Sequence, residues 1–180
     1  MSALADRIVV LHRALDEARL PHAFGGALAL AWCTHRARGT IDVDVNVFVP
    51  VDAVDQVIAA LPSEVNVSTE QRDLLQKDGQ VRLWWGGTPV DVFLNTTAYH
   101  DEVATRVRVE RFAGHEVPFL ACTDLAVFKA FFNRTKDWAD LEEMASAGTL
   151  DRHRVVGVLA EHLGPEDPRV ARVLGLPRPV

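Results

Sequence analysis

The sequence predicts a mixed α/β (α+β) fold, in which a mixed sheet flanked by helices is followed by a helical C-terminal part. Three observations support this prediction. Residues 41–49 alternate between apolar and polar side chains up to Val47, as in a half-buried strand. Glycines at 86–87 and at 114 separate apolar stretches in the manner of β-hairpins. From Thr123 onward, the apolar residues recur at helical spacing.

Each element follows from local patterns of this kind. Proline and glycine mark most of the ends, because proline cannot continue a helix and glycine suits a turn. We expect Asp52, Thr123 and Asp151 to be N-caps, since their side chains can accept hydrogen bonds from the first turn of a helix. The expected elements are helices over 2–19 and 27–32, a loop over 35–40, the strand at 41–49, a helix between Asp52 and Pro62, a short strand at 65–67, a polar loop or helical turn at 70–78, hairpins over 80–94 and 107–119, and helices over 124–132, 136–147, 152–163 and 166–176.

Length and composition indicate an ordinary globular protein. Of the 180 residues, 48% are hydrophobic and 24% are charged. We expect an α/β core over residues 1–120 and a helical C-terminal subdomain over residues 121–180 packed on it. No apolar run approaches the roughly 18–20 residues that cross a membrane, and the acidic start does not resemble a signal peptide. The net charge of −6 is opposite to that of most proteins that coat DNA, but a local basic patch can coexist with it.

The two cysteines, Cys33 and Cys122, are far apart in the sequence and show no C-x-x-C spacing. We therefore expect neither a disulfide framework nor a structural zinc site, and we expect both residues to be small buried apolar groups. A reducing cytoplasm is the expected location.

Three aspartates carry the main chemical hypothesis. Asp42 and Asp44 are two residues apart on a predicted strand, so their carboxylates point to the same face, with Cα atoms roughly 6.5 Å apart. Asp91 lies on a later predicted strand and completes the set if the two strands are neighbours. Hard oxygen ligands of this kind suit magnesium, with manganese as the alternative, and two such ions can clamp an in-line phosphoryl displacement. The alternative is that these acids are ordinary solvent-facing residues of a half-exposed strand.

The segment before these acids has features of a phosphate site. Gly25-Gly26 precedes a short predicted helix, and a glycine turn at a helix N-terminus lets a phosphate approach backbone N–H groups. Arg38 is a candidate triphosphate contact, and Thr40 supplies a hydroxyl close to the acids. Each of these four residues also has an ordinary explanation, as a turn, a solvated loop or a strand end.

The predicted C-terminal helices hold the remaining candidates. Lys129 lies on a helix crowded with phenylalanines, where a charge needs a phosphate, an acidic partner or a route to solvent. Lys136 and Asp140 have i,i+4 spacing and are equally consistent with an ordinary surface pair, while Asp137 shares a face with Asp140.

Other residues have weaker signals. The seven histidines show no ligand spacing. Trp84 and Trp85 should point to opposite faces of a strand, so that one is in the core and the other is free to stack on a base. Four arginines are candidates for a local phosphate-binding patch: Arg82, Arg106, Arg108 and Arg111.

The order of these motifs resembles the nucleotidyltransferase superfamily, which has a polymerase-β-like fold. Gly25-Gly26, a short helix and then Arg-x-Thr-x-Asp-Val-Asp over 38–44 resemble its first motif, and Pro-Val-Asp-Val-Phe around Asp91 resembles the strand of its third carboxylate. The stretch 123–141, with Thr-Asp-Leu-Ala-Val-Phe-Lys at its start and Lys-Asp-Trp-Ala-Asp-Leu at its end, resembles the helical motif of AbiEii- and MenT-like toxins of type IV toxin–antitoxin systems. The sequence departs from many superfamily members at Gly26, where they have serine.

The resemblance implies a function and assigns roles. It implies transfer of a nucleoside monophosphate from a nucleoside triphosphate to an acceptor hydroxyl, expected to be a tRNA 3′ end, with a cognate antitoxin protein as partner and no membrane association. The alternatives are an enzyme that adenylylates aminoglycoside or lincosamide antibiotics and an inactive nucleotide-binding module. The implied catalytic residues are Asp42, Asp44, Asp91 and Lys129; the three aspartates would also hold Mg²⁺ or Mn²⁺; and the implied nucleotide-binding residues are Gly25, Gly26, Arg38, Thr40, Lys136, Asp137 and Asp140.

Overall fold

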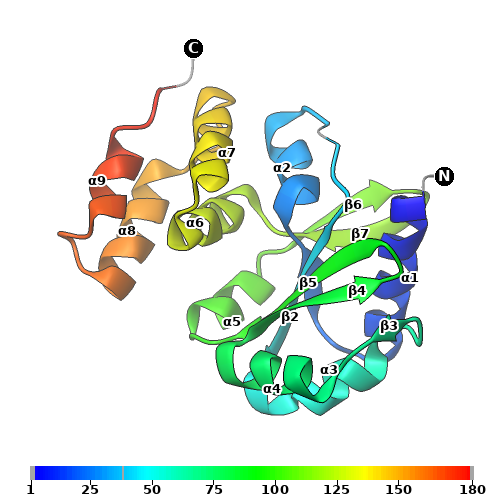
Figure 1. Cartoon of the computed structure of the whole chain (residues 1–180). Helices are drawn as coiled ribbons and strands as arrows, with labels where there is room; N and C mark the ends of the chain where they lie inside the picture. Colours follow the sequence, from blue (N-terminus) through cyan, green and yellow to red (C-terminus); the bar gives the residue numbers. More distant parts are fainter. Residues whose placement is uncertain (1–2, 38, 179–180) are drawn as a thin grey trace. The chain divides into compact units, whose positions relative to one another are not determined.

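Figure 1 shows a computed structural model of the chain, which describes residues 3–37 and 39–178. The described residues form two compact units. Residues 3–26 and 39–120 belong to the first, and residues 27–37 and 121–178 belong to the second. This division differs from the expected one in a single segment, because the short helix after Gly26 groups with the C-terminal helices.

Within the described residues, the first unit contains a seven-stranded mixed sheet in the order β3-β4-β5-β2-β1-β7-β6. The two longest strands, β2 and β5, run parallel at its centre. Both predicted hairpins are confirmed, as β4–β5 and β6–β7. The strands are β1 (His22–Phe24), β2 (Val43–Pro50), β3 (Val65–Asn66), β4 (Gln80–Trp85), β5 (Thr88–Asn95), β6 (Arg108–Phe112) and β7 (His115–Phe119).

The core of the first unit lies on one face of this sheet. Val43, Val45 and Val47 of β2 are at most 1% exposed, and the alternate side chains of β4 and β5 extend the same apolar layer. Helices α1 (Ala3–Glu17), α3 (Val54–Ala60) and α4 (Thr69–Asp78) pack on this layer. Arg7 of α1, for example, donates a hydrogen bond to Thr88 and lies over the ring of Trp85. The intervening positions of β2, β4 and β5 place Asp44, Arg82 and Asp91 on the other face, together with the apolar side chains of Phe48, Trp84 and Phe93.

Two short elements differ from the prediction in residues 51–78. Asp52 does not cap a helix; it lies inside a 3₁₀ turn (Val51–Ala53), and α3 follows with Ala53 at its N-cap. The polar stretch expected to be a loop or turn is the complete helix α4. Ser68 caps it through a reciprocal pair of hydrogen bonds with Gln71, and Gly79 ends it in the left-handed conformation. The capping box therefore stabilises a helix that has little apolar periodicity.

The chain also forms a helix that the sequence did not suggest, α5 (Tyr99–Ala104), between β5 and β6. Its apolar contribution is small: Tyr99 and Val103 are its buried residues. Two inward side chains in six residues are too few to produce a helical period in the sequence.

The second unit consists of helices. Most of α2 (Gly26–Thr34) belongs to it, together with α6 (Cys122–Phe132), α7 (Thr135–Ser146), α8 (Arg152–Leu163) and α9 (Pro168–Leu174). Asp151 caps α8 as predicted, by accepting a hydrogen bond from the backbone of Arg154. Thr123 does not cap α6, which begins one residue earlier with Ala121 at the N-cap.

Contrary to prediction, Cys33 and Cys122 form a disulfide. It joins the last turn of α2 to the first turn of α6, with the two Cα atoms 5.6 Å apart. The sequence separation of 89 residues concealed this pairing, because nothing in the local patterns shows that these helix ends meet. Among the described residues, no helix combines the length and the apolar character that a bilayer crossing requires.

Candidate active site

The three candidate aspartates lie on the polar face of the sheet in the first unit. Asp44 of β2 is paired in register with Asp91 of β5, and Asp91 in turn faces Arg82 of β4. Directly paired residues point to the same face, so these three side chains form a row across three strands. Asp42 precedes β2 by one residue and falls two positions before Asp44. Asp42, Asp44 and Asp91 are called the acid row below.

Arg82 is the cation that pairs with this acid row. Its Nε donates to Oδ1 of Asp91 at 2.7 Å and its Nη2 to Oδ2 at 2.6 Å, which is the paired geometry that guanidinium and carboxylate groups favour. The same Nη2 lies 3.8 Å from Oδ2 of Asp42. The pKa of Arg82 is raised by the hydrogen bonds to Asp91 and, beyond them, by the negative charges of Asp91, Asp42 and Asp44. All three acids therefore lie within electrostatic reach of one guanidinium.

Thr40 orients the first carboxylate. Its hydroxyl donates to Oδ1 of Asp42 and lies 3.3 Å from the Asp42 backbone nitrogen. The side chain of Asp42 is 28% exposed, so this bond holds a partly solvated carboxylate in one rotamer. The structure thus gives Thr40 a contact with an acid; a contact with a nucleotide stays a prediction.

The backbone of Gly25 and Gly26 lies against Asp44. The backbone nitrogen of Gly25 donates to the carbonyl oxygen of Asp44 at 2.9 Å, which closes β1 against β2. Gly26 has a φ of +55°, and a Cβ at this position would lie 1.9 Å from Oδ2 of Asp44. A serine at this position would meet the same carboxylate. In this chain the absence of a side chain lets the backbone approach Asp44 directly.

The donor set of the acid row fits a hard divalent cation in chemistry, since it consists of carboxylate oxygens from two adjacent strands. As the side chains stand, no group of three or more His, Cys, Asp or Glu in the described part of the chain is arranged to hold a metal ion. In the acid row, the guanidinium of Arg82 bonds the carboxylate of Asp91 and lies close to that of Asp42. A cation at these carboxylates would therefore compete with Arg82.

Lys129 heads a second ionic cluster, which lies within the helical unit. Its Nζ is 2.6 Å from Oδ2 of Asp140 and 3.8 Å from Oδ1 of Asp137. Lys129 is 7% exposed, Asp140 2% and Asp137 0%. Arg134, at the surface, donates to both oxygens of Asp137 from Nε and Nη2. Lys129 and Asp140 thus form a buried ion pair, and the two carboxylates share two cations.

Comparison with known proteins identifies the architecture. No family model matches the sequence, and no curated protein matches it. The solution structure of the antibiotic-resistance factor ANT(2'')-Ia matches with a TM-score of 0.62, covering 88% of this chain and 90% of that chain at 16% identity. The lincosamide antibiotic adenylyltransferase LnuA, in a lincomycin-bound crystal structure, matches with a TM-score of 0.53 (82% and 98%, 10% identity). An antigenic nucleotidyltransferase-like protein from Paracoccidioides brasiliensis matches with a TM-score of 0.52 (98% and 94%, 16% identity). This chain has a nucleotidyltransferase fold.

The nucleotidyltransferase fold confirms the fold expected from the sequence resemblance. The special closeness to AbiEii- and MenT-like toxins stays a prediction, because the similar structures named here do not include such a toxin. Arg38 lies outside the described residues, so its predicted contact with a triphosphate stays a prediction as well.

The basic patch expected from four arginines is not a single patch of available cations. Arg82 pairs with Asp91 of the acid row. Arg106 pairs with Glu102, and Arg108 pairs with Glu110 on its own strand. These pairs reduce the net positive charge that the patch would present to RNA.

Two further candidates lie on α7. Lys136 is exposed, and Asp140 pairs with Lys129. Trp85 is buried at 8% exposure, and Trp84 is 50% exposed. The prediction that one tryptophan is in the core and the other outside it is therefore confirmed, whereas stacking of Trp84 on a base stays a prediction. Trp84 lies two residues from Arg82 on the same face.

The role of Arg82 was missed, although the sequence contained the signal. A two-residue turn at Gly86-Gly87 pairs Trp85 with Thr88, and counting back along both strands pairs Arg82 with Asp91. An arginine directly across a hairpin from a candidate metal ligand indicates an ion pair at the site.

Proposed function

We propose that this chain is a metal-dependent nucleotidyltransferase, which moves a nucleoside monophosphate from a nucleoside triphosphate to an acceptor hydroxyl. The observation that carries the proposal is the acid row: three aspartates converge on the polar face of a nucleotidyltransferase-fold sheet, at a glycine turn that adjoins one of them. Three like charges on one face repel each other, and a protein keeps such an arrangement where a cation offsets it.

The proposed reaction forms a bond between the acceptor oxygen and the α-phosphorus and breaks the bond from that phosphorus to the pyrophosphate oxygen. Asp42, Asp44 and Asp91 would hold Mg²⁺ or Mn²⁺. Bound there, the metal would neutralise triphosphate oxygens and lower the pKa of the acceptor hydroxyl. Thr40 keeps the carboxylate of Asp42 oriented, and the backbone N–H groups after Gly25-Gly26 would donate to a phosphate of the nucleotide.

Arg82 has two partners in this scheme. Without substrate its guanidinium neutralises Asp91. If Asp42, Asp44 and Asp91 held a cation, Arg82 would be released from Asp91 and could turn toward the departing pyrophosphate, whose negative charge grows in the transition state. Its 50% exposed side chain can make this change without disturbing the core.

Lys129 is proposed as a further catalytic residue on the strength of the sequence resemblance, with Lys136, Asp137 and Asp140 near the nucleotide. The ion pair between Lys129 and Asp140 also supports a structural role. The two roles are separable, because a structural role changes stability and a catalytic role changes the rate in a folded protein.

The acceptor is proposed to be a tRNA 3′ end, with the chain acting as the toxin of a toxin–antitoxin pair, as the 123–141 motif suggests. One observation favours a second acceptor class. ANT(2'')-Ia, which was crystallised with adenylyl-2''-tobramycin, covers nearly the same length as this chain, with 95% of this chain and 97% of that chain aligned at a TM-score of 0.55. An antibiotic hydroxyl is therefore the alternative.

The test is transfer of label from each α-labelled nucleoside triphosphate, supplied separately with Mg²⁺, to total tRNA and to a panel of aminoglycosides and lincosamides. Asp91→Asn and Asp44→Asn should abolish transfer, whereas the control Asp6→Asn, an exposed acid on α1, should not change it. Labelled tRNA supports the toxin assignment, and labelled drug alone supports the resistance assignment. Failure to label any acceptor, with no Mg²⁺-dependent nucleotide binding, would overturn the proposal and leave an inactive module.

A further inference from the structure

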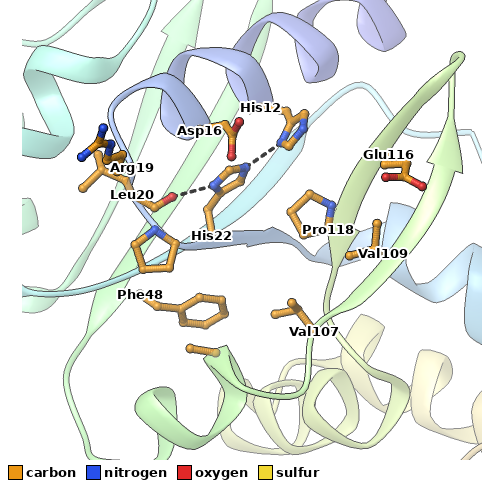
Figure 2. Close-up of a pocket in the computed structure, with 12 residues that line it drawn as sticks. His12, Asp16, Arg19, Leu20, His22, Phe48, Val107, Val109, Glu116 and Pro118 are labelled. Carbon is orange, nitrogen blue, oxygen red and sulfur yellow. Dashed lines mark hydrogen bonds between the residues drawn. The ribbon is translucent and has the colours of Figure 1, made fainter.

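The first unit contains a second feature that the proposed reaction does not use, a cavity of about 630 Å³. Figure 2 shows it between the end of α1 and the strands β1, β2 and β7. Its polar lining includes His12, Asp16, His22 and Glu116, and its apolar walls include Phe48 and Pro118. We call it the histidine cavity. Its volume is in the range of cavities that bind small organic molecules.

The histidine cavity is separate from the acid row. Phe48 lies four residues beyond Asp44 on β2, which places them roughly 13 Å apart along an extended strand. Likewise, His22 is at the start of β1, whereas Gly25 near the acid row follows its end. A ligand in this cavity would therefore occupy a site of its own.

The hydrogen bonds of the two histidines determine what the cavity offers to a ligand. Nδ1 of His22 lies 2.8 Å from the carbonyl oxygen of Leu20, so it must carry the proton and donate. Nε2 of His22 is then an acceptor, and it receives the Nδ1 proton of His12 at 2.9 Å. In the neutral pair, this leaves Nε2 of His12 as an acceptor without its own proton. Figure 2 shows the chain of contacts from His12 through His22 to Leu20.

The surroundings of His12 add more acceptors. The backbone carbonyl of Glu116 faces the His12 ring and raises its pKa, because this oxygen would accept a hydrogen bond from the protonated form of the ring. The carboxylate of Asp16, one helical turn after His12, raises the pKa of both rings through its charge. Burial is the larger effect and lowers both pKa values, so both rings are neutral at physiological pH. Near His12 the cavity thus presents acceptors and negative charge.

Nearby positive groups reduce this negative field only in part. Arg13 and His115 each lower the pKa of His12, but neither lines the cavity. Arg19 does line it, at the end away from Glu116 in Figure 2. Figure 2 places Asp16 beside His12 and His22, between Arg19 on one side and Glu116 on the other, so the acceptors around His12 still favour a cationic donor.

We propose that the histidine cavity binds a small organic ammonium ion with an apolar body. Its N–H groups would donate to the carboxylate of Asp16, to Nε2 of His12 and to the carbonyl oxygen of Glu116. The apolar body would lie against Phe48 and Pro118. The ring face of Phe48 would also attract the ammonium charge. A neutral molecule of the same shape would leave the carboxylate unpaired, so charge determines selectivity.

The test uses benzylammonium chloride as the probe and benzyl alcohol as its neutral counterpart, with the full chain at about pH 8, where the histidines are neutral. Binding is followed by calorimetry and by the side-chain ¹⁵N resonances of labelled histidine. Benzylammonium should bind at least about tenfold more tightly than benzyl alcohol, which is the typical effect of one charge-assisted hydrogen bond. The resonances of His12 and His22 should shift.

Variants separate this site from other causes. Asp16→Asn should weaken benzylammonium binding about tenfold, whereas Glu17→Gln, the adjacent exposed acid outside the cavity, and Asp91→Asn in the acid row should leave it unchanged. Equal binding of the alcohol and the amine would overturn the proposal, as would binding that depends on Asp91 but not on Asp16. Binding that leaves the two histidine resonances unmoved would also overturn it.

Discussion

Replacement of Gly26 by alanine is the sharpest test of the site geometry. The new Cβ would lie 1.9 Å from Oδ2 of Asp44 and 2.6 Å from its Cγ, whereas real Cβ atoms essentially never come closer than 3.0 Å. The carboxylate must therefore move by at least about 1 Å. The backbone φ of +55° adds a conformational cost of roughly 1–2 kcal/mol for any residue with a Cβ.

Two measurements follow from these numbers. Chemical denaturation should show a loss of about 1–3 kcal/mol in the free energy of unfolding, from the left-handed backbone and the displaced side chain. Nucleotidyl transfer should fall by about 100-fold or more in the protein that remains folded, because a shift of about 1 Å in a catalytic group has an effect of that size.

The controls are other glycines of the same unit. A Cβ at Gly39 or Gly87 would meet nothing within 4 Å, so alanine there should preserve both stability and transfer. A Cβ at Gly25 would have contacts of 3.2–3.3 Å and no positive φ, so alanine there should have an intermediate effect. If Gly26→Ala retained wild-type stability and rate, Asp44 would not be the fixed carboxylate that the mechanism requires.

Four further outcomes are expected. Arg82→Gln should tighten Mn²⁺ binding several-fold in calorimetry, because the guanidinium competes with the cation for the same carboxylates; unchanged affinity would contradict that competition. Lys129→Met should lower the free energy of unfolding by about 3–5 kcal/mol by removing the ammonium that pairs with the buried carboxylate of Asp140, and adding Asp140→Leu should recover much of the loss in the same denaturation assay. Reduction of the disulfide, or Cys33→Ser, should destabilise the fold by up to about 4–5 kcal/mol, measured as a lower Tm, whereas reductant should not affect the serine variant further. The folded-state pKa of His22 lies below its usual 6.5, so stability is complete above about pH 6.5 and is lost as pH falls toward the folded pKa; His22→Gln should flatten this part of the pH–stability curve.

Most strands of the sheet could be predicted because their signals are local, although β1, which lies between β2 and β7, was not predicted. Alternation over 41–49, the glycine turns and the proline boundaries each depend on a few neighbouring residues, and β2, β4, β5 and both hairpins formed as expected. The helix α4 was missed because its stability comes from its caps, which apolar periodicity does not register. Helix α6 begins at Cys122, one residue before Thr123, which was the predicted N-cap.

What could not be predicted depends on which distant segments meet. The disulfide between Cys33 and Cys122, the ion pair between Lys129 and Asp140 and the cavity around His22 each join residues from separate elements. The seven histidines show no ligand spacing in the sequence, so nothing there indicates that His12 and His22 face each other. Asp42 and Asp44 were found from the alternation of one local segment, whereas the pairing of β5 with β2, which brings Asp91 beside Asp44, was only a condition of the hypothesis.

The acid row places Asp42, Asp44 and Asp91 on one face of the sheet, and carboxylate oxygens are the ligands that Mg²⁺ prefers. If the acids served only to hold Arg82, Asp91 would suffice, because it already accepts both guanidinium hydrogen bonds. We therefore propose that Asp42, held by a threonine hydroxyl, and Asp44, fitted against a glycine backbone, serve a divalent cation.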